Sequence, residues 1–500
     1  MMKYRKTLVL ILIFISLTAI ILVGSIQKEN VAQANSLGWF SENIGVYNLN
    51  RGVFTPTFGM EIHNFNHLPR AEEANNHWVR HNALLWSDYQ PTSPNEFIRD
   101  TDLEDDMIAV SEAGMELILI VRSAPTWARE FEWSACAPLK RESIPDFADF
   151  MHDLVAFYSQ PPYNVTYYEI WNEPDGVLWD ECAENWPYGC WGDNSDDYFG
   201  GGYYAEMLKG VYPAIKSANP DAQVVIGGLL LSCDPRQPGV YGYCATDEND
   251  GVDWNMIKQA RFFEGILRGN ENVPEGGGDY FDYVNYHGFT YYEEDMSVIQ
   301  MEKNVAYWSA NGGQVAGKLD YLRYVMSEYG VSKPVILSEV TILDHLETEN
   351  IVAFQAAKAD YVVWLFARNL AVDIKATIWY QLDGPGWEKG GLLDENQDPT
   401  PAYEAFDVMT DTLEGAVYSG DLSLDEGMVG FEFFKGARRI WVLFSEDNNQ
   451  HTINLPDYFI RAYNLFGETV TPSEDEISFK RPIYIELEPQ NSIFLPLICR

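Results

Sequence analysis

The chain alternates short β-type runs with longer amphipathic runs, and this alternation limits its fold more than any other feature. Eight runs rich in apolar and β-branched residues follow one another, and the segments between them repeat apolar residues at helical spacing. Strands that alternate with helices pair in parallel, because each connection returns the chain to the same end of the sheet. The predicted strands are 57–62, 77–82, 116–121, 165–171, 222–228, 281–287, 334–339 and 375–381, and the clearest helical segments are 144–159, 203–218, 254–268, 315–329 and 351–370.

Eight such units favour a closed barrel over an open doubly wound sheet. No Gly-rich phosphate-binding sequence follows the first predicted strand, which argues against a dinucleotide-binding fold. From about residue 410 the pattern changes to short strand candidates separated by polar turns. The sequence therefore predicts an α/β fold, with a (β/α)8 TIM barrel over 37–409 and a small C-terminal β-sandwich domain over 410–500. The joining segment DPTPAYEAF has no flexible linker, so we expect the two domains to pack together.

The N-terminus resembles a targeting segment. The basic start MMKYRK precedes an apolar run over 8–24, and the small residues of AQA at 32–34 offer a cleavage site. The apolar run is long for a signal and slightly short for a full span, so an uncleaved membrane anchor is the alternative. We expect residues 1–36 to be a signal peptide or an N-terminal membrane anchor, and the rest to be secreted or extracytoplasmic.

The charge balance excludes some partners. The chain has 75 acidic and 33 basic residues, a net charge of −42, and so repels nucleic acids and anionic lipid surfaces. The same balance argues against a polyanionic substrate. The sequence does not indicate an oligomeric state.

The six cysteines suit an oxidising compartment. Cys182 and Cys190 flank one short aromatic loop, and Cys233 and Cys244 flank another, so we expect two local disulfides with these pairings. Six cysteines allow about 15 connectivities, so the pattern does not exclude other pairs. No CxxC or HExxH signature is present, and we expect neither a metal nor another cofactor.

The run YYEIWNEP, residues 167–174, places carboxylates where a barrel does its chemistry. Glu169, Trp171 and Glu173 alternate and would share one face of a strand, which Pro174 then ends. A carboxylate at the end of a buried strand is costly unless it has a partner or a function. In a (β/α)8 barrel the active site lies at the carboxyl ends of the strands. The candidates at these ends are Arg80, Trp127, Asn172, Glu173, His287, Glu339 and Trp379.

Glu173 and Glu339 form a pair of carboxylates on separate strand ends. Such a pair suits glycoside hydrolysis, in which one carboxyl group donates a proton to the leaving oxygen and the other attacks the anomeric carbon. We expect Arg80 to keep Glu339 ionised, and the charge on Glu339 to hold the proton on Glu173. The high aromatic content, 14%, fits either a large core or flat faces for stacking sugars.

Residues 50–408 resemble clan A retaining glycoside hydrolases, and families 39 and 5 in particular. EIWNEP resembles the acid/base strand of that clan and ILSE its nucleophile strand. Further matches are Arg80, PTWA with Trp127, IGG on the fifth strand, His287 and Trp379. The resemblance implies that Glu173 is the acid/base, Glu339 the nucleophile, Asn172 a ligand of the sugar 2-hydroxyl and Trp379 a stacking platform. Phe289 stands where a tyrosine is usual, and Val340 follows the nucleophile position.

Each candidate also has a purely structural interpretation. Glu173 could sit in a buried ion pair, and Arg80 could serve only as a salt bridge to Glu169. His287 and Trp127 could be core residues. Two further carboxylates, Asp344 and Glu347, lie just beyond the seventh strand and compete with Glu339 for the nucleophile's place.

The aromatic and acidic loop over 182–204 follows the fourth strand and would overhang the site. Trp186 and Trp191 could line outer sugar subsites. Asp193, Asp196 and Asp197 could bind Ca²⁺, but their spacing matches no EF-hand, and a solvated acidic loop is the favoured interpretation.

The sequence thus predicts an extracellular retaining β-glycosidase that hydrolyses O-glycosidic bonds of β-linked oligo- or polysaccharides. The alternative is a non-catalytic carbohydrate-binding protein on a degenerate barrel. A structural surface protein has only the leader in its favour. The sequence does not select the sugar, its linkage, or exo or endo action.

Overall fold

The structure is a computed structural model that describes residues 57–176, 189–244, 254–305 and 307–488. The leader over 1–36, Cys182 and Trp186 lie outside the described residues. Of the helices within these ranges, none combines the length and the apolar character that crossing a membrane requires.

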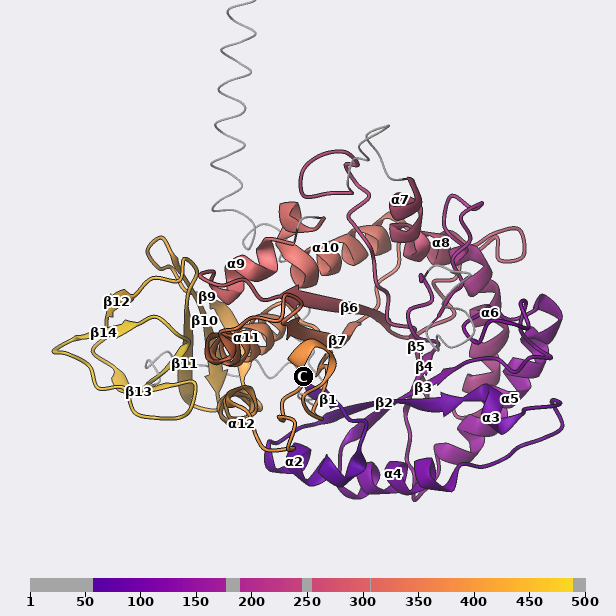
Figure 1. Cartoon of the computed structure of the whole chain (residues 1–500), viewed down its shortest axis with the longest axis horizontal. Coiled ribbons are helices and arrows are strands. Elements are labelled where there is room, and N and C mark those ends of the chain that lie inside the picture. Colours follow the sequence, from indigo (N-terminus) through magenta and orange to yellow (C-terminus); the bar gives the residue numbers. More distant parts are fainter. Residues whose placement is uncertain (1–56, 177–188, 245–253, 306, 489–500) are drawn as a thin grey trace, which may run out of the picture. The chain divides into compact units, whose positions relative to one another are not determined.

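Eight parallel strands in the described residues form one sheet, in the order β5-β4-β3-β2-β1-β8-β7-β6 (Figure 1). The sheet closes on itself, because Val225 pairs with Tyr283 and Leu229 pairs with Tyr286, which joins β5 to β6. This arrangement confirms the predicted (β/α)8 barrel. The strands are β1 (Phe58–Glu61), β2 (Trp78–Leu85), β3 (Glu116–Arg122), β4 (Tyr167–Ile170), β5 (Gln223–Ile226), β6 (Val284–Tyr291), β7 (Val335–Leu343) and β8 (Ala376–Trp379).

Helices connect the strands and surround the sheet (Figure 1). The longer ones match the predicted segments, except that a turn at Arg261 divides the expected helix 254–268 into two. A helix forms over 144–158 because Pro145 suits a first turn and a buried apolar stripe recurs at helical spacing. The helices are α2 (Leu68–Glu73), α3 (Trp86–Tyr89), α4 (Thr101–Glu112), α5 (Ile144–Tyr158), α6 (Gly201–Ala218), α7 (Trp254–Ala260), α8 (Phe262–Arg268), α9 (Val298–Lys303), α10 (Gly313–Glu328), α11 (Ile351–Ala371) and α12 (Pro401–Leu413), and short 3₁₀ turns include η4 (Trp387–Lys389).

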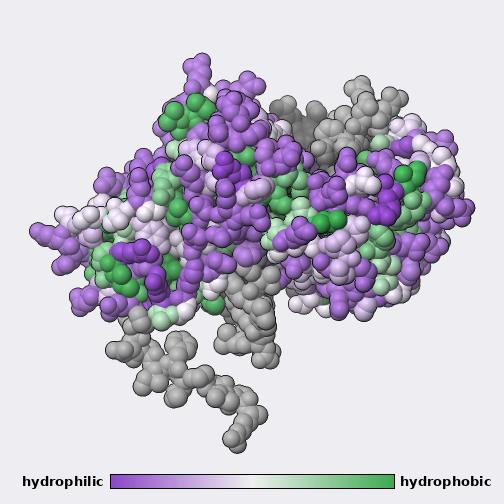
Figure 2. Space-filling model, turned by 90° about the horizontal axis from the view of Figure 1, so that it is seen from below, coloured by the Kyte–Doolittle hydropathy of each residue, from purple (hydrophilic) through white to green (hydrophobic). Residues whose placement is uncertain are grey.

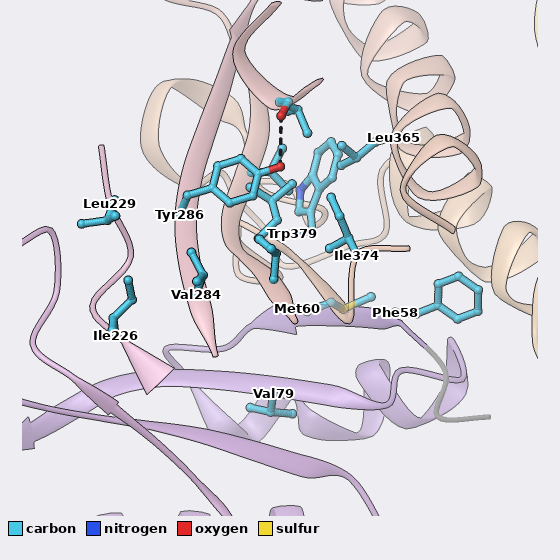
Figure 3. Close-up of a cluster of buried hydrophobic side chains, with 14 of the residues drawn as sticks. Phe58, Met60, Val79, Ile226, Leu229, Val284, Tyr286, Leu365, Ile374 and Trp379 are labelled. Atoms are coloured by element: carbon cyan, nitrogen blue, oxygen red, sulfur yellow. Dashed lines mark hydrogen bonds between the residues drawn. The ribbon is translucent and has the colours of Figure 1, made fainter. Parts of the chain in front are cut away.

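Side chains along each barrel strand alternate between the barrel interior and the layer of helices. Trp78, Ile118, Val225, Ile336 and Ile378 come from five different strands and form one small apolar cluster, which fills the interior. Their neighbours on the strands belong to the large cluster that the helices share. Figure 3 shows part of this outer layer, with Met60, Val79, Tyr286 and Trp379 among its members.

The C-terminal part of the described chain forms two antiparallel sheets, and these confirm the predicted β-sandwich. The first has the strand order β13-β15-β11-β10-β9, and the second pairs β12 with β14. Apolar residues of both sheets, including Leu443, Ile477 and Ile485, form a common core. The strands are β9 (Val417–Asp421), β10 (Met428–Lys435), β11 (Arg438–Ser445), β12 (His451–Asn454), β13 (Phe459–Asn464), β14 (Glu476–Phe479) and β15 (Ile483–Leu487).

The larger sheet of the sandwich packs against the barrel through α11. Trp364 of α11 stacks on Phe431 of β10, and Arg481 pairs with Asp360 at 2.8 Å. The described residues from Thr57 onward belong to one compact unit, and the boundary at 409/410 stays a prediction. The face drawn in Figure 2 is mainly hydrophilic, as the acidic composition leads us to expect.

Two disulfides lie in the described residues, and they confirm one predicted pairing and correct the other. Cys233 bonds Cys244 as expected. The predicted bond between Cys182 and Cys190 is wrong, since Cys190 bonds Cys136. The reason is tertiary. The loops after β3 and β4 lie side by side, and the Cys190 N–H donates to the Cys136 carbonyl at 3.2 Å.

Candidate active site

Arg80 of β2 organises the carboxyl end of the barrel. Its side chain is fully buried, and its five N–H groups make five hydrogen bonds within the protein. No N–H is left for a ligand, so the prediction that Arg80 binds substrate is wrong, and the residue holds other groups in place. Its partners are Glu169 Oε2 at 2.9 Å and Oε1 at 3.0 Å, Glu61 at 2.6 Å, Asn172 at 2.6 Å and Glu339 at 2.5 Å.

Glu61 at the end of β1 is a site residue that sequence reasoning missed. Burial opposes its ionisation, but the charge of Arg80 and a hydrogen bond from His63 outweigh that effect and lower its pKa to about 2. Glu61 is therefore a permanent negative charge beneath the site. The available signal was a carboxylate at the end of the first predicted strand, in TFGMEIH.

Glu173, His287 and Glu339 meet above Arg80. His287 Nδ1 lies 2.9 Å from Glu173 Oε1, and His287 Nε2 lies 3.5 Å from Glu339 Oε1. One carboxylate oxygen of Glu173, one of Glu339 and a His287 nitrogen all lie within 4.8 Å of one another. Burial lowers the pKa of His287 to about 4, so the ring is neutral at pH 7 and carries one N–H.

Burial also governs the ionisation of the two carboxyl groups. It raises the pKa of Glu173 to about 7, and that of Glu339 to about 7, although Arg80 opposes the shift in both. Two carboxyl groups this close share one proton near neutral pH. Because Arg80 donates an N–H directly to Glu339, the charge is favoured on Glu339 and the proton on Glu173.

The sequence predicted that the strand continues to residue 171 and that Glu169, Trp171 and Glu173 share one face. The structure does not have this arrangement. The strand ends at Ile170, and Trp171 and Glu173 adopt left-handed φ values of 72° and 47°. Trp171 therefore leaves the face of Glu169 and packs against Trp191 in the outer layer. Non-glycine residues in this conformation are strained and concentrate at functional sites.

Asn172 offers an unused donor at this turn. Its side chain is fully buried and its Oδ1 accepts from Arg80. Its Nδ2 has no hydrogen-bond partner among the described residues. A buried N–H without a partner is costly, and a ligand oxygen at this position would satisfy it.

A buried lysine lies behind the site, where no sequence pattern indicated one. Lys318 of α10 is 4% exposed, and its Nζ donates to the His287 carbonyl at 2.8 Å. Burial lowers its pKa to about 7, against the attraction of Asp175 and Glu173. Lys318 therefore fixes the backbone of His287 and places a titratable charge near Glu173.

The two tryptophans predicted to bind substrate, Trp379 and Trp127, differ in burial: Trp379 is fully buried and Trp127 is half-buried. Trp379 is fully buried in the outer layer of β8 (Figure 3). Its indole N–H donates to the Gly390 carbonyl at 3.0 Å. The prediction that it stacks on a sugar is wrong, because Ile378 occupies the interior face and the next residue must point outward. Trp127 is half-buried, packs against Trp86, and donates to the Gln90 carbonyl at 2.9 Å.

Asp344, which competed with Glu339, and the acidic loop have other partners. Asp344 pairs with Lys389 at 2.6 Å. In the acidic loop, Asp193 accepts from Ser195, and Asp196 accepts from backbone N–H groups, which favours the solvated-loop interpretation over a Ca²⁺ site.

Glu173, His287 and Glu339 are also close enough to hold a metal ion. However, Arg80 already binds Glu339 Oε1 and puts a positive charge there. The arrangement therefore suits proton transfer better than cation binding.

Comparisons with known proteins agree with this fold. No family model matches the chain, and no curated protein matches it. A family 39 glycoside hydrolase from the gut symbiont Bacteroides cellulosilyticus has a similar structure, with a TM-score of 0.63, 17% identity, and coverage of 87% of this chain and 81% of that one.

Two further solved structures have the same architecture. A family 30 subfamily 8 xylanase from Clostridium acetobutylicum has a TM-score of 0.52 and 10% sequence identity. A glucosidase from Croceicoccus marinus has a TM-score of 0.52 and 11% sequence identity. Each comparison covers 87% of this chain and 96% of the other. At such identities the likeness shows the fold, and the resemblance to glycoside hydrolases is confirmed at that level.

Proposed function

We propose that this protein is a retaining β-glycosidase, with Glu339 as nucleophile and Glu173 as acid/base. One observation carries the proposal: a carboxylate oxygen of Glu173, in the turn after β4, and one of Glu339, on β7, lie within 4.8 Å of each other in different electrostatic surroundings. Retaining enzymes hold their two carboxyl groups about 5–5.5 Å apart, and inverting enzymes about 6.5–9.5 Å apart. The short separation supports the retaining mechanism.

The reaction has two steps. In the first, Glu339 attacks the anomeric carbon while Glu173 gives its proton to the departing glycosidic oxygen, and a covalent glycosyl-enzyme forms. In the second, Glu173, now ionised, removes a proton from water, and the water oxygen displaces Glu339 from the anomeric carbon. Two inversions return the original configuration, and both carboxyl groups regain their starting charge.

Neighbouring residues would support these steps. The Arg80 bond stabilises the negative charge on Glu339. His287 orients Glu173 through its Nδ1 contact. The unpaired Nδ2 of Asn172 would donate to the sugar 2-hydroxyl, and the half-buried Trp127 would line an outer subsite.

The predicted export fits this activity. Disulfides persist in oxidising compartments, and two are present in the described residues. Fusion of residues 1–40 to a reporter should carry it out of the cytoplasm, and N-terminal sequencing of the mature protein will distinguish a cleaved signal from an anchor.

The mechanism predicts different defects for the two carboxylates. Glu339→Ala should abolish glycosyl-enzyme formation. Glu173→Ala should slow substrates with poor leaving groups most, because an activated leaving group needs little protonation. Azide should rescue Glu173→Ala and give a β-glycosyl azide, whereas with Glu339→Ala it should give the α-product.

Turnover of a panel of aryl β-glycosides, with NMR of the first-formed anomer, tests this assignment. An inverted product from the wild-type protein, or full activity in Glu339→Ala, would contradict it. Binding of glycans without any turnover would instead identify a carbohydrate-binding protein.

A further inference from the structure

The loop after β8 presents one large aromatic ring to solvent. Trp387 begins the short 3₁₀ turn η4 and keeps 49% of its surface exposed. Its ring contacts Phe289 edge-on, with 5.3 Å between centroids. Phe289 in turn contacts the ring of His287 at 6.4 Å. Trp387 is thus two ring contacts away from the residue that holds Glu173.

Further rings continue this row around the barrel mouth. Tyr380 contacts Phe289 edge-on at 6.2 Å and His63 at 5.9 Å. His63 bonds Glu61, a partner of Arg80. The rings therefore follow the carboxyl ends of β6, β8 and β1. This is the side of the barrel mouth that includes β7, the strand of Glu339.

The loop that carries Trp387 is held from beneath by buried side chains. The Gly390 carbonyl accepts from Trp379 Nε1 at 3.0 Å and from Thr341 Oγ1 at 3.1 Å. Lys358 of α11 is 1% exposed, and its Nζ donates to the carbonyls of Lys389 at 3.0 Å and Gly391 at 2.5 Å. A buried lysine is costly unless its N–H groups are satisfied, so these bonds tie the loop to the core.

The same loop is strained where it turns. Glu388 and Lys389 have left-handed φ values of 43° and 60°. Asp344 fixes both, because its N–H donates to the Glu388 carbonyl at 3.0 Å and its carboxylate binds Lys389. The core thus holds a strained loop in one conformation, and in that conformation about half of the Trp387 surface is exposed.

We propose that Trp387 is the platform on which a sugar ring of a β-linked oligosaccharide stacks, in a subsite beside Glu173 and Glu339. Pyranose rings have an apolar face of C–H groups that packs well on an indole. Trp379 then has a supporting role, since it holds the platform loop through Gly390. This inference rests on the proposed function and names a specificity residue of the same site.

The test compares Trp387→Ala, Trp387→Phe and a control, Tyr324→Ala. Tyr324 is also aromatic and 44% exposed, but lies on the outer helix α10. Substrates are xylo-, cello- and manno-oligosaccharides. Trp387→Ala should lower kcat/KM for the preferred series about tenfold or more, mainly through KM. Trp387→Phe should recover most of this loss, and Tyr324→Ala should match wild type. An unchanged KM in Trp387→Ala overturns the proposal.

A binding measurement separates this proposal from the reaction. The tryptophan fluorescence of full-length Glu173→Gln is measured during titration with the same oligosaccharides. The fluorescence change on binding should disappear in Glu173→Gln/Trp387→Phe, because that variant lacks the indole on which the sugar stacks. An equal fluorescence change in both proteins would contradict the role of Trp387 as the platform, even if the wild-type protein is active. A Trp387-dependent titration without wild-type turnover overturns only the glycosidase assignment. Absence of both binding and turnover with all three series overturns both.

Discussion

Gly228 shows how closely the side chains of the candidate site depend on a single small residue. A Cβ at this position would lie 2.0 Å from His287 Nε2. The Gly228 N–H also donates to Glu169 Oε1 at 3.0 Å, and its carbonyl accepts from the Glu173 N–H at 3.1 Å. Only glycine allows this close approach of backbone to imidazole.

Gly228→Ala should therefore displace His287 and disturb the position of Glu173. We expect kcat/KM to fall about 100-fold, since small misplacements of reacting groups have effects of this order, and stability to fall by about 1–3 kcal/mol. Gly420→Ala is the control, because a Cβ there meets no heavy atom within 4 Å. Equal activity in the two variants would contradict this account.

Glu173 also makes stability depend on pH. Its pKa is raised from 4.5 to about 7 in the folded state, so between these values the folded protein binds more protons than the unfolded one. The free energy of unfolding must then fall as pH rises through this window, by up to about 3 kcal/mol. Glu173→Gln cannot ionise and avoids this loss.

We expect Glu173→Gln to be more stable than wild type at pH 8 and similar to it at pH 4.5, as measured by urea unfolding. Glu426→Gln, a change at an exposed turn residue, is the control and should show the same difference from wild type at both pH values. A Glu173→Gln variant that gains nothing at pH 8 would show that Glu173 ionises without cost.

At the scale of elements, a short strip of the loop after β4 supports the turn that carries Glu173. Gly189 donates its N–H to the Asn172 carbonyl at 2.6 Å, and Trp191 donates to the Pro174 carbonyl at 3.0 Å. The disulfide from Cys136 to Cys190 anchors this strip to the loop after β3. The position of Glu173 thus depends on two neighbouring loops and one covalent bond.

Removing the Cys136–Cys190 disulfide should lower stability and activity more than removing the Cys233–Cys244 disulfide. The Cys136–Cys190 bond spans 54 residues and the Cys233–Cys244 bond spans 11, which correspond to about 4 and about 3 kcal/mol of lost loop entropy. We expect Cys136→Ser/Cys190→Ser to have the lower melting temperature and the lower kcat. The matched control is Cys233→Ser/Cys244→Ser, and the reverse order would contradict the supporting role of the strip.

At the scale of the whole molecule, the contact between barrel and sandwich is apolar and well packed. Trp364 of α11 stacks on Phe431 at 5.8 Å and meets Phe444 edge-on at 5.2 Å. Its indole N–H donates to Glu302 Oε2 at 3.1 Å. Such a contact should make the two parts unfold together.

Trp364→Ala should lower the free energy of unfolding by about 3–5 kcal/mol, the usual cost of removing a buried tryptophan. Trp133→Ala, at a 44% exposed position, is the control and should change it by less than about 0.5 kcal/mol. Calorimetry should show a single transition for the wild-type protein. Two separate transitions, or equal effects of the two substitutions, would contradict the coupling.

Local patterns in the sequence were sufficient to predict the fold and the residues that meet in the candidate site. Period-two and helical repeats depend on neighbouring residues, so the eight strands and most helices could be predicted. The ends of parallel barrel strands meet whatever the details of register. Glu173, His287 and Glu339 were therefore found as members of one site, although their roles stay predictions.

Only the tertiary structure decided which face each strand presents and which loops meet. A shift of one residue turns a strand side chain to the opposite face, so Trp379 faces the helices. Trp387 is exposed because of the loop conformation after β8, which side chains from distant segments fix. Arg80 is saturated because four partners from three other strand ends converge on it. Cys190 bonds Cys136 and not Cys182, its predicted partner nearby in the sequence. Contacts between distant segments depend on tertiary packing, which no local sequence pattern determines.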